Sequence, residues 1–160
     1  MRSRQALFWF LVFAFSLALA GSVSAWMVKI PLENLVKEAD YIVVGKVTEM
    51  RSAWDADGRW IRTYVTISVD RLIKGPSLRR EFVISYIGGV VGQIGLWLSD
   101  TPAFKPGQHV LVFLQPDGRG TFKVTGRYQG KFTVEENRIV EQNAAADAFL
   151  KRIKTIMKSQ

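Results

Sequence analysis

Two stretches of alternating residues decide the fold: residues 41–50, YIVVGKVTEM, and residues 60–73, WIRTYVTISVDRLI. Both are rich in β-branched side chains, and apolar and polar residues alternate in them with the period of two that half-buried strands have. Gly45 lies where a bulge or a bend in a coiled strand requires a glycine. Between the stretches, Asp57-Gly58 is a strong hairpin signal. We therefore expect two long antiparallel strands joined by a hairpin.

Shorter strand patterns follow at intervals of roughly ten residues. They occupy residues 80–87, 109–114, 121–127, 130–134 and 138–140. The run HVLVFL at 109–114 is almost wholly apolar, which is typical of a buried strand. By contrast, GGVVGQIG at 88–95 is rich in glycine and predicts a loop with special backbone angles, not a strand interior.

Two helices are expected at the ends of this strand-rich region. Apolar residues at helical spacing predict a short helix within residues 31–40, with Pro31 at an early position, and a longer helix over about 143–158, capped by Asn143. The order of elements predicts a mainly β chain. Its fold class is a small closed barrel with a short N-terminal helix and a C-terminal helix.

Residues 1–25 predict an export signal. Arg2 and Arg4 precede an apolar run that ends at Ala20, and the small-residue stretch to Ala25 suits cleavage before Trp26. The run is shorter than the roughly 20 apolar residues that a membrane-crossing helix needs. An uncleaved anchor and a cut after Ala20 are the alternatives. We expect residues 26–160 to form one secreted or periplasmic domain that meets the membrane only through its signal peptide.

The composition excludes several classes of function. The 160 residues contain no cysteine and one histidine, so a disulfide framework, a thiolate nucleophile and a zinc site of several His or Cys ligands are ruled out. We expect no cofactor and no metal. The formal net charge of +8 falls to +6 without the two arginines of the export signal. In an exported protein this charge favours anionic envelope partners over nucleic acid, or simply a solvated basic surface.

The chain also carries a family resemblance. Residues 38–47, EADYIVVGKV, followed by YVTISV at 64–69 and LIKG at 72–75, resemble the netrin-like domains, which include the tissue inhibitors of metalloproteinases. The sequence FKPG at 104–107, before HVLVFL, resembles uncharacterised secreted bacterial proteins with the same layout. The resemblance implies an OB-type five-stranded barrel. Those inhibitors use an N-terminal cysteine to reach the enzyme's zinc, whereas Trp26 stands at the comparable end here. The resemblance therefore supports the fold more than the activity.

Aromatic residues at turns are the first candidates for a binding surface. Trp54 and Trp60 flank the Asp57-Gly58 turn. Such a pair can fill a partner's pocket, stack on sugar rings or pin the hairpin to the barrel. The expected contact region combines the mature N-terminus, this hairpin and the glycine-rich loop: Trp26, Met27, Trp54, Trp60, Gly88, Gly89 and Trp97.

Other patterns have simpler explanations. Asp55 and Asp57 have the spacing of calcium-loop carboxylates but lack the later acidic ligand, so a plain turn is expected. Residues 88–92 lack the strand-to-helix context of a phosphate loop, and His109 is expected to be structural. An OB-type barrel also suggests a glycan-binding sheet face, for which the candidates are Arg62, Tyr64, Tyr86, Phe122, Lys123 and Arg127.

No pair of acid–base residues is identifiable from spacing, so we do not expect an enzyme. The leading hypothesis is a non-catalytic binding module for another envelope or extracellular protein, with peptidases as one class of partner. The first alternative is an envelope glycan-binding domain that uses Trp54 and Trp60. The second is a small hydrolase whose acid pair only a structure would reveal.

Overall fold

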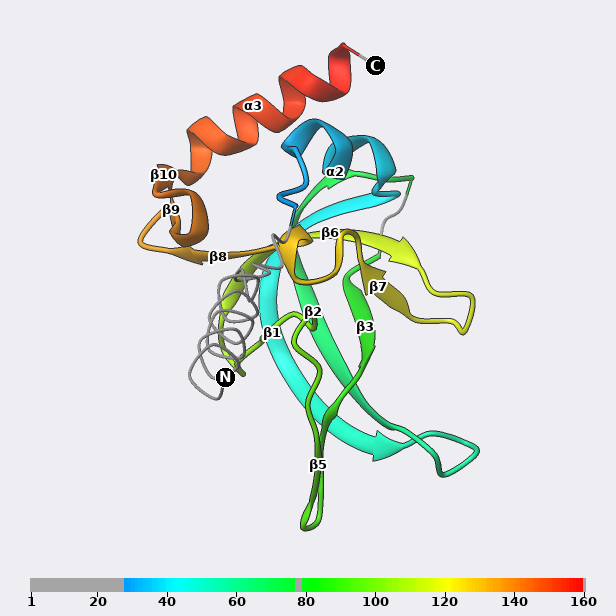
Figure 1. The fold of residues 1–160 in the computed structure, drawn as a ribbon. Helices are drawn as coiled ribbons and strands as arrows, with labels where there is room; N and C mark the ends of the chain where they lie inside the picture. Colours follow the sequence, from blue (N-terminus) through cyan, green and yellow to red (C-terminus); the bar gives the residue numbers. More distant parts are fainter. Residues whose placement is uncertain (1–27, 77–78, 160) are drawn as a thin grey trace, which may run out of the picture.

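The computed structural model describes residues 28–76 and 79–159 (Figure 1). The export signal and the candidates Trp26 and Met27 lie outside the described residues. No helix within the described ranges is long and apolar enough to cross a membrane. The elements are α2 (Leu32–Glu38), β1 (Tyr41–Trp54), β2 (Ile61–Lys74), β3 (Glu81–Ile87), β4 (Gly89–Val91), β5 (Ile94–Leu96), β6 (His109–Pro116), β7 (Phe122–Val124), η1 (Arg127–Gly130), β8 (Lys131–Glu135), β9 (Arg138–Ile139), η2 (Val140–Gln142), β10 (Ala144–Ala145) and α3 (Ala146–Lys158).

Five strands close a small mixed barrel in the order β1-β2-β3-β7-β6, and β6 pairs again with β1. The pairings are antiparallel except for β3 with β7, which are parallel. One edge of β6 pairs with β1. The other edge pairs with β8 in the first half of β6 and with β7 at the C-terminal end of β6. From β8 the sheet continues into β9 and β10. This arrangement confirms the predicted fold class, a mainly β closed barrel with a helix toward each end of the chain.

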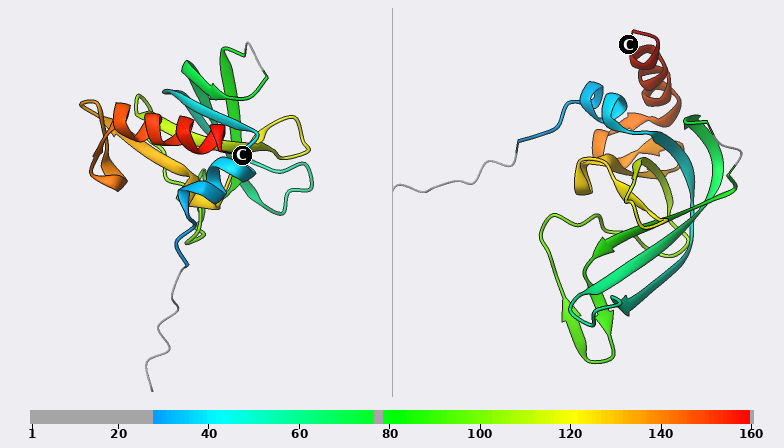
Figure 2. Two further views of the ribbon diagram at one scale, coloured as in Figure 1. Left: turned by 90° about the horizontal axis from the view of Figure 1, so that it is seen from above. Right: turned by 90° about the vertical axis from the view of Figure 1, so that its right-hand side faces the viewer.

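Gly45 provides the bend that the sequence predicts in the first strand. The register of β1 against β2 shifts between Val44 and Gly45. A Cβ at Gly45 would lie less than 3.0 Å from the Ser68 carbonyl oxygen, so the two backbones approach more closely here than a side chain permits. Beyond the bend, β1 and β2 stay paired as far as Trp54 and Ile61. The two strands thus extend past the closed part of the barrel as a long curved ribbon (Figure 2).

The strands bury apolar side chains on two faces, which gives two cores. Inside the barrel, Phe82 is fully buried, and its ring meets the rings of Tyr41 and Phe122 edge-on. Outside the barrel, α2 and α3 cover a second core that includes Phe113 and Phe132. In Figure 2 the two helices lie side by side over one end of the barrel. The predicted buried strand at 109–114 is therefore confirmed as β6, whose HVLVFL run is apolar on both faces because β6 contributes to both cores.

Two sequence-based predictions of elements were wrong. The glycine-rich segment 88–95 is not a loop, because it forms the β4–β5 hairpin, with Gly92 in a left-handed conformation at its turn. Asn143 does not cap α3, which begins at Ala146 with Ala145 as N-cap. Instead, Asn143 has a φ of 46° and ends η2. The residues that follow it pair with β9, and this pairing delays the start of the helix.

Candidate binding surface at the hairpin end

Two hairpins meet at the end of the barrel opposite α2 and α3 (Figure 1). One is the far end of the β1–β2 ribbon, where Trp54 pairs with Ile61. The other is β4–β5, whose first residues lie against that ribbon because the Gly88 N–H donates a hydrogen bond to the Ile61 carbonyl (2.8 Å). The structure therefore brings Trp54, Trp60 and the glycine-rich segment to one end of the molecule, whereas Trp26 and Met27 of the predicted contact region lie outside the described residues.

Gly88 and Gly89 allow this close approach. Their φ angles are 124° and 126°, a region that L-residues rarely adopt. A Cβ at Gly89 would lie less than 3.0 Å from the hydroxyl oxygens of Ser52 and Thr63. Those hydroxyls are 2.8 Å apart, and Thr63 donates to the Gly88 carbonyl (2.6 Å). Glycine is thus needed for the backbone of β4 to lie directly over the ribbon.

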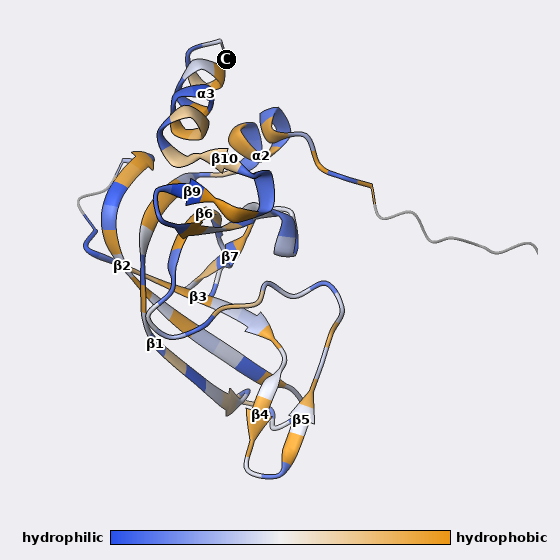
Figure 3. Ribbon diagram, turned by 90° about the vertical axis from the view of Figure 1, so that its left-hand side faces the viewer, coloured by the Kyte–Doolittle hydropathy of each residue, from blue (hydrophilic) through white to orange (hydrophobic). Residues whose placement is uncertain are grey.

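The same end carries most of the exposed large apolar side chains. Trp97 is 78% exposed, Trp60 49% and Trp54 42%. Figure 3 shows that β4 and β5 carry apolar residues away from the barrel. No charged residue occurs between residues 86 and 99. We call the following set the hairpin-end surface: Trp54, Trp60, Val90, Ile94, Trp97 and Leu98.

A tight turn fixes the two tryptophans of the ribbon. The Asp55 carboxylate accepts hydrogen bonds from the N–H groups of Arg59 (2.8 Å) and Trp60 (3.2 Å). Desolvation acts to raise the pKa of Asp55, but these hydrogen bonds and the nearby arginine charges outweigh it and hold the pKa below its usual value. The Asp55 carboxylate therefore stabilises the turn, and Gly58 takes the expected left-handed conformation.

Among the described residues, no cluster of three or more His, Cys, Asp or Glu side chains has a metal-binding arrangement.

A groove of about 560 Å³ lies between the ribbon and the β4–β5 hairpin. Its lining includes the hydroxyl-bearing residues Ser52, Thr63 and Tyr86, together with Trp97 and Phe104. Burial raises the pKa of the Tyr86 phenol, although a hydrogen bond with Thr63 opposes this. The groove thus combines neutral hydroxyl groups with aromatic walls next to the hairpin-end surface.

A second groove, of about 520 Å³, runs over β3 and β7 and contains most of the predicted glycan-binding face. Phe122 does not belong to that face, because it is 6% exposed and packs inside the barrel. Two carboxylates, Asp100 and Asp117, line the groove beside four cations: Arg62, Arg119, Lys123 and Arg127. Arg127 forms an ion pair with Asp100. The groove therefore carries an excess of positive charge.

Sequence reasoning missed the network that anchors this groove. The Asp117 carboxylate accepts hydrogen bonds from Ser85 (3.0 Å), from the Thr121 hydroxyl, and from the N–H groups of Arg119 (2.8 Å) and Thr121 (3.1 Å). Partial burial acts to raise the pKa of Asp117, but these hydrogen bonds outweigh it and lower the pKa overall. The Pro116-Asp117-Gly118 sequence is typical of a turn, whereas Ser85, which donates to Asp117, lies on β3, far away in the sequence.

The single histidine also has a partner that sequence spacing did not suggest. His109 Nδ1 lies 3.3 Å from Asp70 Oδ2, and both side chains are about half exposed. The pair reaches across β1, which lies between β2 and β6 in the barrel.

No protein-family model matches the chain, and no curated protein is significantly similar to it in sequence.

Proposed function

We propose that residues 26–160 act outside the cytoplasm, secreted or in the periplasm, as a non-catalytic binding module that docks another protein through the hairpin-end surface. The observation that carries the proposal is the gathering of exposed tryptophan and aliphatic side chains on two adjacent hairpins. Contiguous apolar patches are uncommon on monomeric proteins and are typical of interaction sites. Tryptophan is also enriched among the residues that dominate the energy of protein interfaces.

The local backbone supports this proposal because it holds the surface in place before binding. The turn at Asp55 orients Trp60, and the hydroxyl contacts around Gly89 fix the base of the second hairpin. A preorganised surface loses less conformational entropy when a partner binds. The β4–β5 hairpin also lacks charged residues, which natural proteins commonly use to keep exposed strand edges from pairing. An uncharged hairpin that stands out from the barrel is suited to being covered.

We also propose that the protein is related to the netrin-like domains. The strand order β1-β2-β3-β7-β6, with closure of β6 on β1 and a parallel β3–β7 pairing, agrees with the OB-type barrel that the resemblance implies. Since that family includes metalloproteinase inhibitors, an extracellular peptidase is one class of partner to examine. The family's cysteine-based contact with zinc has no counterpart here, because the chain has no cysteine.

Affinity capture from envelope and culture-supernatant extracts tests the proposal. The wild-type protein is compared with a Trp60→Ala/Trp97→Ala double variant and with Val140→Ala. Val140 is a suitable control because it is 49% exposed but lies on η2, which packs against β8 and is not part of the hairpin-end surface. We expect one protein at a stoichiometric level with wild type and Val140→Ala, and its loss with the double variant. Equal capture by all three baits, or enrichment of glycan alone, would contradict docking through the hairpins.

The second candidate is binding of an envelope glycan. It is favoured by the hydroxyl-lined groove beside Trp97 and by the positively charged groove over β3 and β7. Hydroxyls and aromatic rings suit sugar recognition, and the cations suit an acidic sugar. A glycan that is retained by wild type but released by Lys123→Ala or Trp97→Ala would support this function in place of protein docking. Lys154→Ala, on α3, is the control for the loss of one positive charge.

A further inference from the structure

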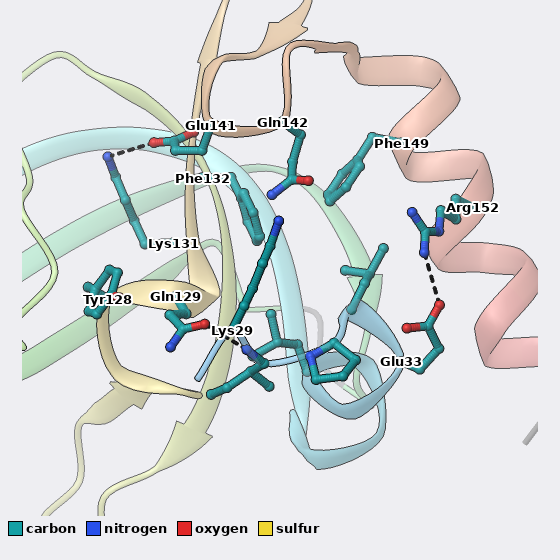
Figure 4. Close-up of a pocket in the computed structure, with 14 residues that line it drawn as sticks. Lys29, Glu33, Tyr128, Gln129, Lys131, Phe132, Glu141, Gln142, Phe149 and Arg152 are labelled. Atoms are coloured by element: carbon teal, nitrogen blue, oxygen red, sulfur yellow. Dashed lines mark hydrogen bonds and ion pairs between the residues drawn. The ribbon is translucent and has the colours of Figure 1, made fainter. Parts of the chain in front are cut away.

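A cavity lies at the end of the molecule opposite the hairpin-end surface, between the two helices and the barrel (Figure 4). Its volume is about 680 Å³, which is within the usual range for small-molecule sites. Leu35 from α2, Phe132 from β8 and Phe149 from α3 line it, and each is at most 6% exposed. The edge of the second core therefore forms an apolar wall of the cavity, with aromatic side chains from β8 and α3.

The charged residues around the cavity are almost balanced. Lys131 Nζ donates to the Thr133 hydroxyl (2.7 Å) and lies 3.7 Å from Glu141 Oε1. On the other side, Arg152 Nη2 lies 3.0 Å from Glu33 Oε1. Each of these two carboxylates thus already faces a cation.

Lys29 is the exception among the charged residues of this cavity. Within the described ranges it has no ion-pair partner, and Figure 4 shows its side chain extending into the cavity toward Phe132 and Gln142. Gln129 holds the adjacent backbone in place, because its side chain accepts a hydrogen bond from the Ile30 N–H (2.8 Å) and donates one to the Val28 carbonyl (3.1 Å). The cavity therefore presents one uncompensated positive charge beside an apolar wall.

We propose that this cavity binds a small amphiphile that has an apolar chain and a single carboxylate head. The chain packs on Phe132 and Phe149, and the carboxylate pairs with Lys29. A neutral apolar ligand would leave the Lys29 charge unpaired, and a cationic one would be repelled by it. A second carboxylate on the ligand would face Glu33 or Glu141. This inference is independent of the proposed docking function, which uses the opposite end of the barrel.

The test measures the affinity of the purified protein for octanoate, decanoate, dodecanoate and the uncharged dodecanol by titration calorimetry. Each added methylene that enters the cavity is expected to tighten binding about fourfold. Lys29→Met keeps an unbranched side chain and removes the charge, so it is expected to weaken dodecanoate binding about fivefold and leave dodecanol binding unchanged. Lys151→Met, on an exposed position of α3 outside the cavity, is the matched control and should bind like wild type.

A second variant fills the cavity without changing its charge. Gln142→Trp introduces a large side chain at a half-buried lining position and should abolish binding of both the acid and the alcohol. Circular dichroism melting curves show whether each variant remains folded. The proposal is overturned if dodecanoate binds wild type, Lys29→Met and Gln142→Trp equally, or if affinity does not depend on chain length. Binding to phosphatidylglycerol vesicles without binding of free dodecanoate would also overturn it, because this would assign the charge to a membrane-facing surface.

Discussion

Substitution of Gly89 by alanine tests whether glycine sets the position of the second hairpin. At Gly89 the new Cβ meets the hydroxyls of Ser52 and Thr63 at less than 3.0 Å, and φ is 126°. The backbone conformation costs about 1–3 kcal/mol for an L-residue. Displacing the two hydroxyls also breaks two hydrogen bonds, at about 1 kcal/mol each. The base of the hairpin should therefore lose about 3 kcal/mol or more.

Gly92 provides the matched control. Its φ is 60°, but a Cβ there would meet nothing within 4 Å, so Gly92→Ala carries only the backbone cost of about 1–2 kcal/mol. Urea unfolding reports global stability, and hydrogen exchange of the Gly88 N–H, which donates to Ile61, reports local opening. We expect Gly89→Ala to lower stability or accelerate this exchange clearly more than Gly92→Ala. Equal effects of the two variants in both measurements would refute the close approach of β4 to the ribbon.

Three further predictions concern the barrel. Phe82→Ala should lower the free energy of unfolding by about 3–5 kcal/mol, measured by urea denaturation, because Phe82 is fully buried between other aromatic rings. Burial acts to raise the pKa of the Asp117 carboxyl, but its hydrogen bonds outweigh burial and lower the pKa overall. The stability that the Asp117 carboxylate contributes is therefore present above the unfolded pKa of about 3.9 and is lost as pH falls through the folded pKa. Asp117→Asn should therefore reduce the loss of stability on acidification below about pH 5, followed in melting experiments. Trp60→Ala should change the free energy of unfolding by less than about 1 kcal/mol, measured by urea denaturation, since Trp60 is half exposed.

The closed barrel could be predicted from the sequence because its signals are local. Alternation along residues 41–50 and 60–73 depends only on the period of two, and Gly45 and Gly58 mark the bend and the turn. The burial of β6 on both faces could likewise be inferred from an unbroken apolar run. The β4–β5 hairpin was missed because glycine usually weakens a strand, whereas here glycine allows the strand to pack against a neighbouring backbone.

The candidate sites were only partly predictable, because their geometry depends on contacts between distant residues. Trp54, Trp60 and Trp97 were identified as aromatic residues near turns, but no local pattern determines whether an aromatic side chain is exposed. Phe122 illustrates the difficulty, because it lies on a candidate binding face by sequence and inside the barrel in the structure. The contact between Ser85 and Asp117 depends on how β3 and β7 meet, which the sequence pattern does not specify.

Apolar side chains are covered by helices at one end of the barrel and exposed to solvent at the other. At one end, α2 and α3 cover the outer faces of β6 and β8 and form a second core. At the other end, the hairpins extend beyond the closed part of the barrel, and no described helix lies over them (Figure 1). The glycines that fix β4 against the ribbon hold these side chains in place while leaving them in solvent. Such an ordered, exposed apolar surface brings little stability to the isolated chain, whereas under the proposed docking function a partner would remove it from water.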